Sequence, residues 1–403
     1  MTGILVIGAG GVGAATAHKC AQHNDELGDI CLASRTVEKC DSVIEAIREK
    51  GNIKNKEGRI YSAQVDAMDT NQVVDLIKRT NSGLVLNVAS PYCNQTIMRA
   101  CLEARAHYLD TAVYEEEGHI NESPPWYANH EWKHKDEFIA RGITGVLGIG
   151  FDPGAVNVFC AYVHKHLIDT VDTIDIMDVN AGNHGRFFAT NFDPETNLRE
   201  IMEDVIYWEN GDFVTIPHHS KSITYDFPQL GKHRVYSMGH DELHSLPFNI
   251  PAKRIEFWMG FNDQYINCFN VLKELGLLSS RPVQVEGTPV VPIKLLKAVL
   301  PDPPSLAREY SGSVCIGCLV KGSQDQKNKE VFIYTLCDHA DCCKDIGSQA
   351  ISYTTAVPLV TAAILVARGD WNVLRLVNVE ELEPDPFMEL MPKLGLDWSI
   401  QES

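Results

Sequence analysis

Three glycines near the start of the chain have a spacing that suits phosphate binding. Gly8, Gly10 and Gly13 follow the apolar run ILVI and precede AATAHKCAQH, whose small residues are typical of a helix packed close to a sheet. In such a unit the first glycine permits a tight turn, the second lets the backbone approach a diphosphate, and the third lets helix and strand pack closely. The pattern predicts a dinucleotide site at this helix start. The residues expected to line it are Gly8, Gly10, Gly11, Val12 and Gly13.

A cation stands where dinucleotide sites usually have a carboxylate. About 20 residues after the last glycine of such a motif, a carboxylate normally binds the adenine-ribose hydroxyls and repels a 2′-phosphate. Here the residues are Ser34, Arg35 and Thr36. Two hydroxyls and a guanidinium suit a phosphate dianion, so the sequence predicts NADPH rather than NADH as the cofactor. The alternative, that Arg35 is only a solvent-facing residue at a strand end, stays open.

Alternating strand and helix patterns must position these residues. Strand patterns at 59–66, 83–90 and 107–113 alternate with helix patterns at 71–80 and 94–106. The order predicts a Rossmann-like, doubly wound parallel sheet of the α/β class. Ligands of such sheets lie beyond the carboxyl ends of the strands, although residues there can also be simple turn residues. The further cofactor residues expected on this ground are Asp66, Ala67, Asn87, Ala89, Ser90 and Pro91.

A sharp turn at residues 150–154 precedes another helix pattern. Asp152 followed by Pro153 is a typical N-cap and first-turn pair, which alone would explain the turn. The functional alternative is that this helix start faces a cleft and offers its backbone N–H groups to a substrate carboxylate.

The second half of the chain has a different pattern. Several strand patterns between residues 172 and 261 predict an antiparallel or mixed sheet, and residues 349–371 predict a long apolar helix that returns to the first domain. A chain of 403 residues suits more than one core. We expect a cofactor domain at 1–150, a substrate domain at 151–345 and a returning segment at 346–403.

Composition excludes several classes of protein. A net charge of -19 and the absence of Lys/Arg runs argue against nucleic acid as a partner. The apolar run AVPLVTAAILVA is shorter than the roughly 18 residues of a membrane span, and no basic segment precedes the opening apolar run. Together with 12 scattered cysteines, this predicts a cytoplasmic protein with reduced thiols and no membrane partner.

Four residues have the spacing of a structural zinc site. Cys315 and Cys318 form one pair, and His339 and Cys342 form another. The first pair lies in the strand pattern SVCIGCLV, where residues three apart point to opposite faces. We therefore expect no metal.

The motifs together resemble the saccharopine dehydrogenase and reductase family. The resemblance rests on the glycine turn, SRT at 34–36, SPY at 90–92 and GFDPG at 150–154. The longer stretches DVNAGNHGRFFATNFDPETN and EPDPFMELMPKLGLDW are similar to the carboxynorspermidine (carboxyspermidine) dehydrogenase branch. That resemblance implies an NADPH-dependent condensation of 1,3-diaminopropane or putrescine with L-aspartate β-semialdehyde, for polyamine synthesis. It also implies a Rossmann domain with an inserted α+β substrate and dimerisation domain, a C-terminal segment rejoining the first domain, and a homodimer.

The same resemblance places candidate residues around the cleft. His240, Asp152 and Tyr92 are the catalytic candidates, and His240 could serve as acid or base or simply pack. The substrate candidates are Tyr92, Asn180, Asp193, His240, Asp241 and Arg254. Reductase relatives place a substrate-binding arginine where this chain has His240, so the residue that binds the substrate carboxylate stays open.

Two other functions stay open at this stage. A saccharopine reductase would join a longer dicarboxylic semialdehyde to glutamate, and would need a second cation to bind the extra carboxylate. A non-catalytic NADPH-sensing protein would share the glycine turn but would show no turnover.

Overall fold

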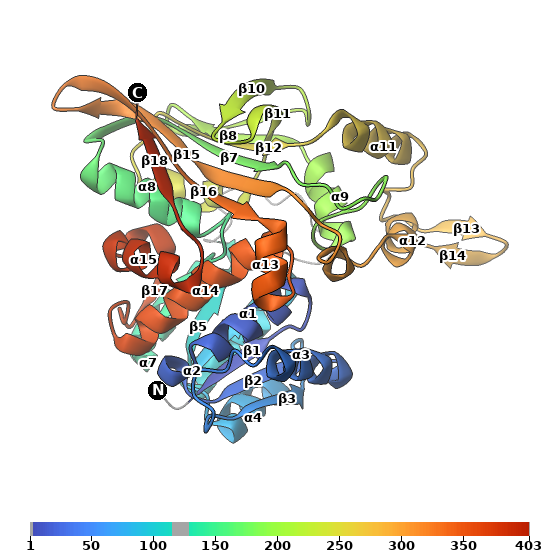
Figure 1. Cartoon of the computed structure of the whole chain (residues 1–403), viewed down its shortest axis with the longest axis vertical. Coiled ribbons are helices and arrows are strands. Elements are labelled where there is room, and N and C mark those ends of the chain that lie inside the picture. Colours follow the sequence, from blue (N-terminus) through green and yellow to red (C-terminus); the bar gives the residue numbers. More distant parts are fainter. Residues whose placement is uncertain (1–2, 115–128, 403) are drawn as a thin grey trace.

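The computed structural model describes residues 3–114 and 129–402, which form two main sheets, one above the other in Figure 1. Within these residues the first sheet has seven strands, all parallel, as expected for a doubly wound α/β domain. Their spatial order is β17 (Leu376–Asn378), β6 (Gly145–Leu147), β5 (His107–Asp110), β4 (Leu84–Asn87), β1 (Ile4–Ile7), β2 (Ile30–Ser34) and β3 (Ile60–Gln64).

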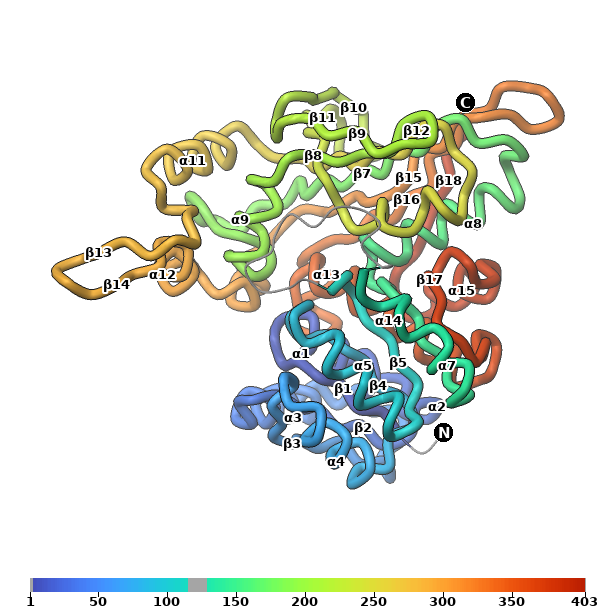
Figure 2. Tube along the Cα trace, turned by 180° about the vertical axis from the view of Figure 1, so that it is seen from behind, coloured from blue at the N-terminus to red at the C-terminus, as the bar shows by residue number. Residues whose placement is uncertain are grey.

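Helices cover both faces of the first sheet. Ile4 and Val6 of β1 pack on one side, whereas Leu5 and Ile7 pack on the other, so the strand is apolar along its whole length. The first face packs against α1 (Gly11–Gln22), α3 (Val37–Lys50) and α14 (Ala350–Arg368). The second face packs against α4 (Thr70–Thr80), α5 (Asn94–Ala104) and α7 (Lys135–Arg141), which lie in front in Figure 2.

The second sheet is mixed, as the sequence predicts. β12 pairs with β7 in parallel, and the other pairings of this sheet in the described residues are antiparallel. The main order is β10 (Ser222–Phe227), β11 (Gly231–Met238), β12 (Arg254–Gly260), β7 (Thr170–Asn180), β15 (Ser313–Gln324), β16 (Lys327–Asp338) and β18 (Ser399–Glu402). Beside it, β8 (Val205–Glu209) pairs with β12 and with β9 (Asp212–Ile216).

The two faces of this sheet have different surroundings. Ile174, Ile176 and Phe257 face inward and share one core with the first sheet and with α8 (Ala155–His166). Met177 and Trp258 belong to a separate cluster on the outer face. Because side chains alternate along a strand, Asp178 lies on the inner side with Ile174 and Ile176, toward the first domain.

The C-terminal segment links both sheets. The predicted long helix is confirmed as α14, which packs against α1, and β17 pairs with β6 of the first sheet. The last strand, β18, instead pairs with β16 of the second sheet. Among the described residues α14 is long and apolar enough to cross a membrane, but 83% of its apolar window is buried inside the fold, as in a core helix.

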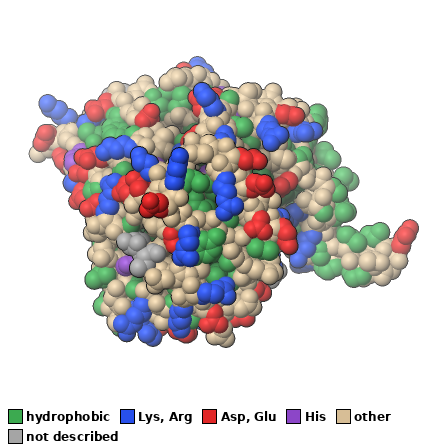
Figure 3. Space-filling model, turned by 60° about the horizontal axis from the view of Figure 1, so that its bottom comes forward, with side chains coloured by type: hydrophobic (Ala, Val, Ile, Leu, Met, Phe, Trp, Pro, Cys, Tyr) green, Lys and Arg blue, Asp and Glu red, His purple; other side chains and the backbone are tan. Residues whose placement is uncertain are grey.

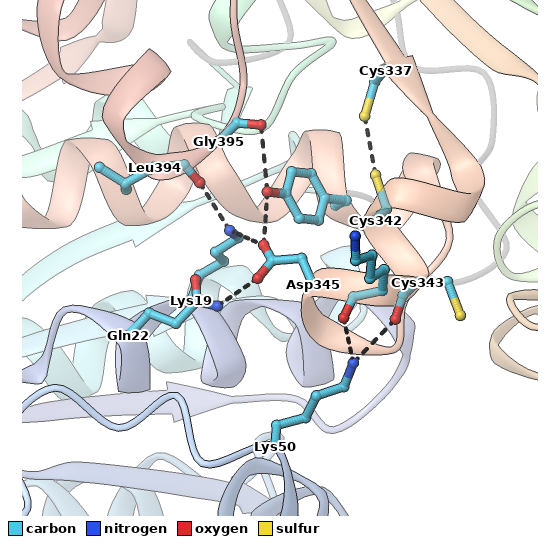
Figure 4. A network of polar contacts seen from close by, with 11 residues as sticks. Lys19, Gln22, Lys50, Cys337, Cys342, Cys343, Asp345, Leu394 and Gly395 are labelled. Carbon is cyan, nitrogen blue, oxygen red and sulfur yellow. Dashed lines mark hydrogen bonds and ion pairs between the residues drawn. The ribbon is translucent and has the colours of Figure 1, made fainter.

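A polar cluster fastens this segment to the first domain (Figure 4). Lys19 of α1 is 2% exposed, and its ammonium donates to Asp345 at 2.6 Å and to the Leu394 carbonyl oxygen at 2.8 Å. Asp345, on α13 (His339–Ile346), also accepts from Gln22 and from the Tyr353 hydroxyl. The helix that follows the glycine turn is thus held from behind by the second half of the chain.

An arm projects from the body of the molecule (Figure 1). It consists of α11 (Asp263–Glu274), the hairpin β13 (Val283–Val285) and β14 (Thr288–Val290), and α12 (Pro292–Val299). The remaining helices used below are α9 (Pro194–Met202) and α15 (Pro384–Leu390), with the 3-10 helices η1 (Pro91–Cys93), η3 (Asp241–His244) and η4 (Pro303–Leu306).

The predicted start of α8 at Asp152 and Pro153 is wrong. The helix begins at Ala155, and Gly154 is its N-cap. The Gly154 N–H donates to Asn157 Oδ1, and the next two N–H groups donate to the carbonyl oxygens of Gly150 and Phe151. These three amides are already bonded within the chain, so the suggestion that they bind a substrate carboxylate is not supported.

Candidate active site

The glycine turn is tightly packed on one side and open on the other. Gly8 has a φ of +121°, and a Cβ there would lie 2.4 Å from the Val88 carbonyl oxygen. A Cβ at Gly13 would lie 2.0 Å from the Gly8 carbonyl oxygen, so neither position has room for a side chain. At Gly10, by contrast, no described atom lies within 4 Å of a Cβ built there. The turn is therefore open where a diphosphate would approach the backbone.

Residues from the second half of the chain cover this turn. A Cβ at Gly11 would lie 2.8 Å from Ser352 Oγ of α14 and 3.5 Å from Pro304 of η4. Neither residue is predicted from the sequence, because no local pattern marks a side chain that reaches the turn from the far end of the chain.

The Ser34-Arg35-Thr36 turn lies at the carboxyl end of β2. Arg35 and Thr36 are exposed, and the Arg35 guanidinium makes no hydrogen bond or ion pair within the described part of the chain. Ser34 is different, because its hydroxyl donates to the Thr36 carbonyl oxygen at 2.9 Å and accepts from the Thr36 N–H at 3.2 Å. Ser34 shapes the turn, and Arg35 and Thr36 present the exposed side chains.

The other strand-end candidates differ in accessibility. Asn87 is 2% exposed, and its amide donates to Asn94 Oδ1 at 2.8 Å and to the Tyr108 hydroxyl at 3.1 Å. It holds the ends of β4 and β5 together. Asp66 accepts from the Met68 N–H and is partly exposed. Of the remaining candidates Ala67 is buried, Ala89 and Pro91 are partly exposed, and Ser90 is exposed.

Cys93 lies near Arg35 and contacts Met68, although no sequence pattern marks either residue. The two sulfur atoms are 3.6 Å apart, and Met68 is 56% exposed. Burial raises the pKa of the Cys93 thiol, and the nearby Arg35 guanidinium opposes that rise. The ends of β2, β3 and β4 thus converge where the adenosine half of a dinucleotide lies in this fold.

His240 is a charged group on the opposite side of the cleft. Its Nδ1 donates to Glu242 Oε2 at 2.7 Å, and its ring stacks on Phe257 with centroids 3.9 Å apart. Burial alone would lower the pKa of His240, but the buried Glu242 carboxylate outweighs it, and the pKa rises to about 10. The ring is protonated at neutral pH, and its Nε2 makes no hydrogen bond with any other described residue.

Asp152 and Asp178 are two further carboxyl groups beside His240. Burial and the Asp178 carboxylate raise the pKa of Asp152 well above its usual value. Burial also raises the pKa of Asp178 to about 7, although the His240 charge opposes that rise. This pair can hold a proton at neutral pH next to an imidazolium. Asp178 was missed because nothing in the strand pattern TIDIMDVN marks it.

A second group of carboxyl groups lies at the end of β5. Burial raises the pKa of Asp110 to about 7 and that of Glu131 to about 8. Asp241 lies close enough to raise both values further, and it accepts from the Val113 N–H at 3.0 Å. The segment that carries His240 is thereby tied to the first sheet. The rule that selected Asp66 as a strand-end residue would also have selected Asp110.

Tyr92 meets a cation from the second domain. Tyr92 lies in η1, directly after the loop that follows β4, and its hydroxyl oxygen accepts from Arg199 Nη1 at 2.6 Å. Arg199 belongs to α9 and is 7% exposed. Tyr92 is a predicted site residue, whereas Arg199 is not marked by any pattern in the sequence.

Two family models together match most of the chain. The saccharopine dehydrogenase NADP binding domain matches residues 4–146, and the saccharopine dehydrogenase C-terminal domain matches residues 150–396. The chain belongs to the saccharopine dehydrogenase family. Its fold also resembles that of the saccharopine dehydrogenase (L-Glu forming) of Saccharomyces cerevisiae, with a TM-score of 0.72 at 13% identity over 100% of this chain and 99% of that one.

Three curated relatives are similar over nearly the whole chain. The carboxynorspermidine synthase of Vibrio alginolyticus is 52% identical over 400 residues, and that of Vibrio cholerae is 50% identical over 400 residues. The carboxyaminopropylagmatine dehydrogenase of Synechocystis sp. is 44% identical over 403 residues. Each match covers 99% of this chain and 97% of the relative.

This member of the saccharopine dehydrogenase family is an NADP-dependent oxidoreductase that acts on CH–NH bonds. Its own residues fit that cofactor. The glycine turn leaves space at Gly10 for a diphosphate, and Arg35 and Thr36 are exposed where a 2′-phosphate would lie.

Three of the predicted substrate-binding residues instead contact other residues of this chain. Asn180 accepts from the Gly182 N–H and donates to the Tyr310 hydroxyl at 2.7 Å. Asp193 caps α9 and forms an ion pair with Lys297 at 2.6 Å. Arg254 does not contact His240.

Arg254 pairs instead with Asp175 and Glu256, at 2.8 Å and 2.5 Å. It alternates with Ile255 and Phe257 along β12 and therefore lies on the outer face of the second sheet, with Trp258.

The residues with zinc-like spacing are also separated. Cys315 belongs to the outer cluster of the second sheet and Cys318 to the inner core, which confirms that they point to opposite faces. Cys342 lies elsewhere, with its sulfur 3.1 Å from that of Cys337 (Figure 4). Within the described residues no group of three or more His, Cys, Asp or Glu side chains could hold a metal ion.

Proposed function

We propose that this protein reduces the imine formed between L-aspartate β-semialdehyde and a diamine, 1,3-diaminopropane or putrescine, in polyamine biosynthesis. The observation that carries the proposal is the 52% and 50% identity, over 99% of the chain, to two carboxynorspermidine synthases. The coarser step, an NADPH-dependent reduction within polyamine synthesis, is supported by all three curated relatives.

The reaction makes and breaks a small set of bonds. The amine nitrogen adds to the aldehyde carbon, and loss of water leaves a C=N bond. When bound, NADPH supplies the hydride that reduces the imine carbon. The chain must therefore hold two substrates together, donate a proton to the departing hydroxyl and stabilise an iminium cation.

His240 is suited to the proton transfer. Its imidazolium persists at neutral pH because of Glu242, and Nε2 is the ring nitrogen not bonded to that carboxylate. Asp152 and Asp178 lie beside it and can accept or return a proton. A proton donated by His240 to the departing hydroxyl can be replaced from this pair.

The charge of the cleft favours a diamine over a second amino acid. Two sets of carboxyl side chains lie on this side of the cleft. Asp152, Asp178 and Glu242 form the set beside His240, and Asp241, the next residue after His240, lies near the second set at the end of β5. Burial raises the pKa of these carboxyl groups, and a bound ammonium group would favour their ionised form and gain from it, whereas the second carboxylate of glutamate would disfavour that form and gain nothing. This argues against the saccharopine reductase alternative.

The amine substrate has one further candidate. The 44% identity to a carboxyaminopropylagmatine dehydrogenase favours agmatine as a second amine, whose guanidinium would also suit an acidic cleft. Diaminopropane and putrescine differ by one methylene, which is worth about 1 to 3 kcal/mol of discrimination.

The test is NADPH oxidation by the purified protein with L-aspartate β-semialdehyde and each amine in turn. We expect turnover only when aldehyde and amine are both present, with the highest kcat/KM for diaminopropane or putrescine. A higher value for agmatine would identify it as the substrate. NADPH binding without turnover for any pair would instead identify an NADPH-sensing protein.

A further inference from the structure

Asp178 is a buried carboxyl group without a hydrogen-bond partner in the described part of the chain. It is 9% exposed, its Oδ1 is buried, and neither oxygen makes a hydrogen bond or ion pair with a described residue. A buried carboxyl group without such a bond costs free energy, so contacts within the folded chain do not account for Asp178. Each of the other buried Asp and Glu side chains among the described residues accepts at least one hydrogen bond; these are Asp110, Glu131, Asp175, Glu242, Glu256 and Glu380.

The register of the second sheet places Asp178 beside His240. β12 runs parallel to β7, and Phe257 of β12 lies next to Ile176 of β7 on the inner face. Asp178 follows two residues later on the same face of β7. The His240 ring stacks on Phe257 with centroids 3.9 Å apart. Asp178 is therefore about 5 Å across and about 7 Å along the sheet from the residue that supports the His240 ring.

The neighbours of Asp178 leave its carboxyl group open to a cation from outside the chain. Glu242 already accepts from His240 Nδ1 at 2.7 Å. The Tyr310 hydroxyl is near enough for Asp178 to raise its pKa, but it donates to Asn191 at 2.6 Å. Protonation of Asp178 would not remove the need for a partner, because a neutral carboxyl group requires an acceptor for its proton. A ligand with an ammonium group would supply both a donor and a compensating charge.

The diamine substrate has a cationic group in the required place. After one nitrogen has joined the aldehyde carbon, the other remains an ammonium group at the far end of a short carbon chain. His240, as the proposed proton donor, must contact the hydroxyl on that same aldehyde carbon. The far ammonium group therefore lies a few carbon-carbon bonds from His240, which is compatible with the position of Asp178 on the sheet.

The semialdehyde also has an ammonium group, but this group fits the surroundings of Asp178 less well. A carboxylate is attached to the same carbon atom, and it would disfavour the ionised form of Asp152 and Asp178. The far end of the diamine has no such carboxylate. The two buried acids therefore favour the diamine.

We propose that Asp178 binds the ammonium group at the unreacted end of the diamine. This inference rests on the proposed function. The contact would compensate a carboxylate that is otherwise alone in a buried place. Its distance from the reacting carbon would also make Asp178 a residue that selects amines by length and by the presence of a second charge.

The experiment compares two amines in each variant. 1,3-Diaminopropane has the second ammonium group, and propylamine is the same molecule without it. NADPH oxidation is measured at a fixed concentration of L-aspartate β-semialdehyde, and the ratio of the two kcat/KM values is the readout. We expect the wild-type protein to prefer diaminopropane by about 100-fold, and Asp178→Asn to reduce that preference to within a few-fold of unity. A loss of proton transfer would lower both values and cancel in the ratio.

Two variants complete the comparison. Asp178→Glu keeps the charge but brings it closer to the reacting carbon, so it should retain a preference for diamines and lower the kcat/KM of putrescine relative to that of diaminopropane about tenfold. Asp172→Asn is the matched control, because Asp172 lies on the same strand but is partly exposed and pairs with Lys253 at 2.6 Å. Its ratios should equal those of the wild type.

The outcomes separate this inference from the proposed function. If Asp178 were only structural, or bound the ammonium group of the semialdehyde, Asp178→Asn would leave the amine ratio unchanged, which would overturn the inference. If Asp178→Asn does not fold, an unchanged ratio of putrescine to diaminopropane in Asp178→Glu would overturn it equally. A wild-type protein that uses propylamine as well as diaminopropane would also overturn it, while the proposed reduction would stand. A wild-type protein that oxidises no NADPH with the semialdehyde and any amine would overturn the proposed function itself.

Discussion

Arg35 is the residue that we expect to set the preference for NADPH over NADH. Its guanidinium is exposed at the end of β2 and makes no ion pair in the described part of the chain, so a 2′-phosphate can approach it. We predict that Arg35→Asp raises the KM for NADPH about 100-fold, because it removes a charge-assisted bond and adds a repulsive charge, while the KM for NADH changes by less than about threefold. Steady-state kinetics with both cofactors measures the ratio.

Lys56→Asp is the matched control for this change. Lys56 is exposed in the same domain but outside the Ser34-Arg35-Thr36 turn, so the same change of charge should leave the ratio unaltered. Equal losses of NADPH and NADH in Arg35→Asp would contradict the phosphate assignment.

Glu242 controls the charge of His240. A raised histidine pKa means that the imidazolium is present below that pKa and is lost as the pH rises through it, here near 10. In Glu242→Gln burial would dominate and lower the pKa, with Asp152 and Glu200 as the remaining anions. We predict that the alkaline limb of the kcat/KM profile moves to lower pH by about three units, and that activity at pH 8 therefore falls about tenfold.

The control for this profile is Glu330→Gln, which removes an exposed acid paired with Lys321 on the second sheet. Its profile should coincide with that of the wild type. An unmoved alkaline limb in Glu242→Gln would exclude His240 as the proton donor.

Helices and strands were predictable where local patterns are strong. The parallel strands and the helices between them follow from apolar runs with short connections, and α14 follows from its long apolar segment. The start of α8 was mispredicted because Asp152-Pro153 is a strong local start signal, whereas Asn157 supplies the cap for Gly154. The hydrogen bond from the Gly154 N–H to Asn157 accompanies the later helix start, and residue propensities do not predict that bond.

The contact between α1 and α13 is a separate, testable feature of the elements. Asp345→Ala would leave the Lys19 ammonium, which is 2% exposed, with only the Leu394 carbonyl oxygen as a hydrogen-bond acceptor in the described structure. We predict a loss of about 3 kcal/mol in the free energy of unfolding, because an uncompensated buried charge is costly. Chemical denaturation measures it.

Lys165→Met provides the comparison for this ion pair. Lys165 pairs with Glu383 and Asp385 on the surface, and removal of such an exposed pair should cost less than about 1 kcal/mol. Similar losses in the two variants would show that burial of Lys19 does not set the cost.

At the scale of the whole molecule, the cleft depends on contacts between distant parts of the chain. Gly11 lies against Ser352, the Tyr92 hydroxyl accepts from Arg199, and the Val113 N–H donates to Asp241. Each contact joins the first domain to later segments, and no pattern in either segment indicates its partner. Tyr92 and Asp241 were therefore found by resemblance to the family, whereas Arg199 and Ser352 became visible only in the folded chain.

The projecting arm bears on the assembly of the molecule. Hydrophobic side chains gather along it (Figure 3), and Leu275 and Val299 are 68% and 67% exposed. The other strongly exposed apolar residues of this arm are Val271, Val283, Val285 and Leu295. So many exposed apolar side chains in one projection are typical of a protein-protein contact.

We propose that the protein is a homodimer in which this arm contacts the second copy. Light scattering of the wild-type protein should give twice the chain mass, and Leu275→Asp combined with Val299→Asp should shift it to one chain, because two charges would be buried unpaired in the contact. Ile139→Asp is the control, since Ile139 is 60% exposed on α7 of the first domain, away from the arm. A wild-type monomer would contradict the dimer, whereas a dimer that survives the double substitution would place its interface elsewhere.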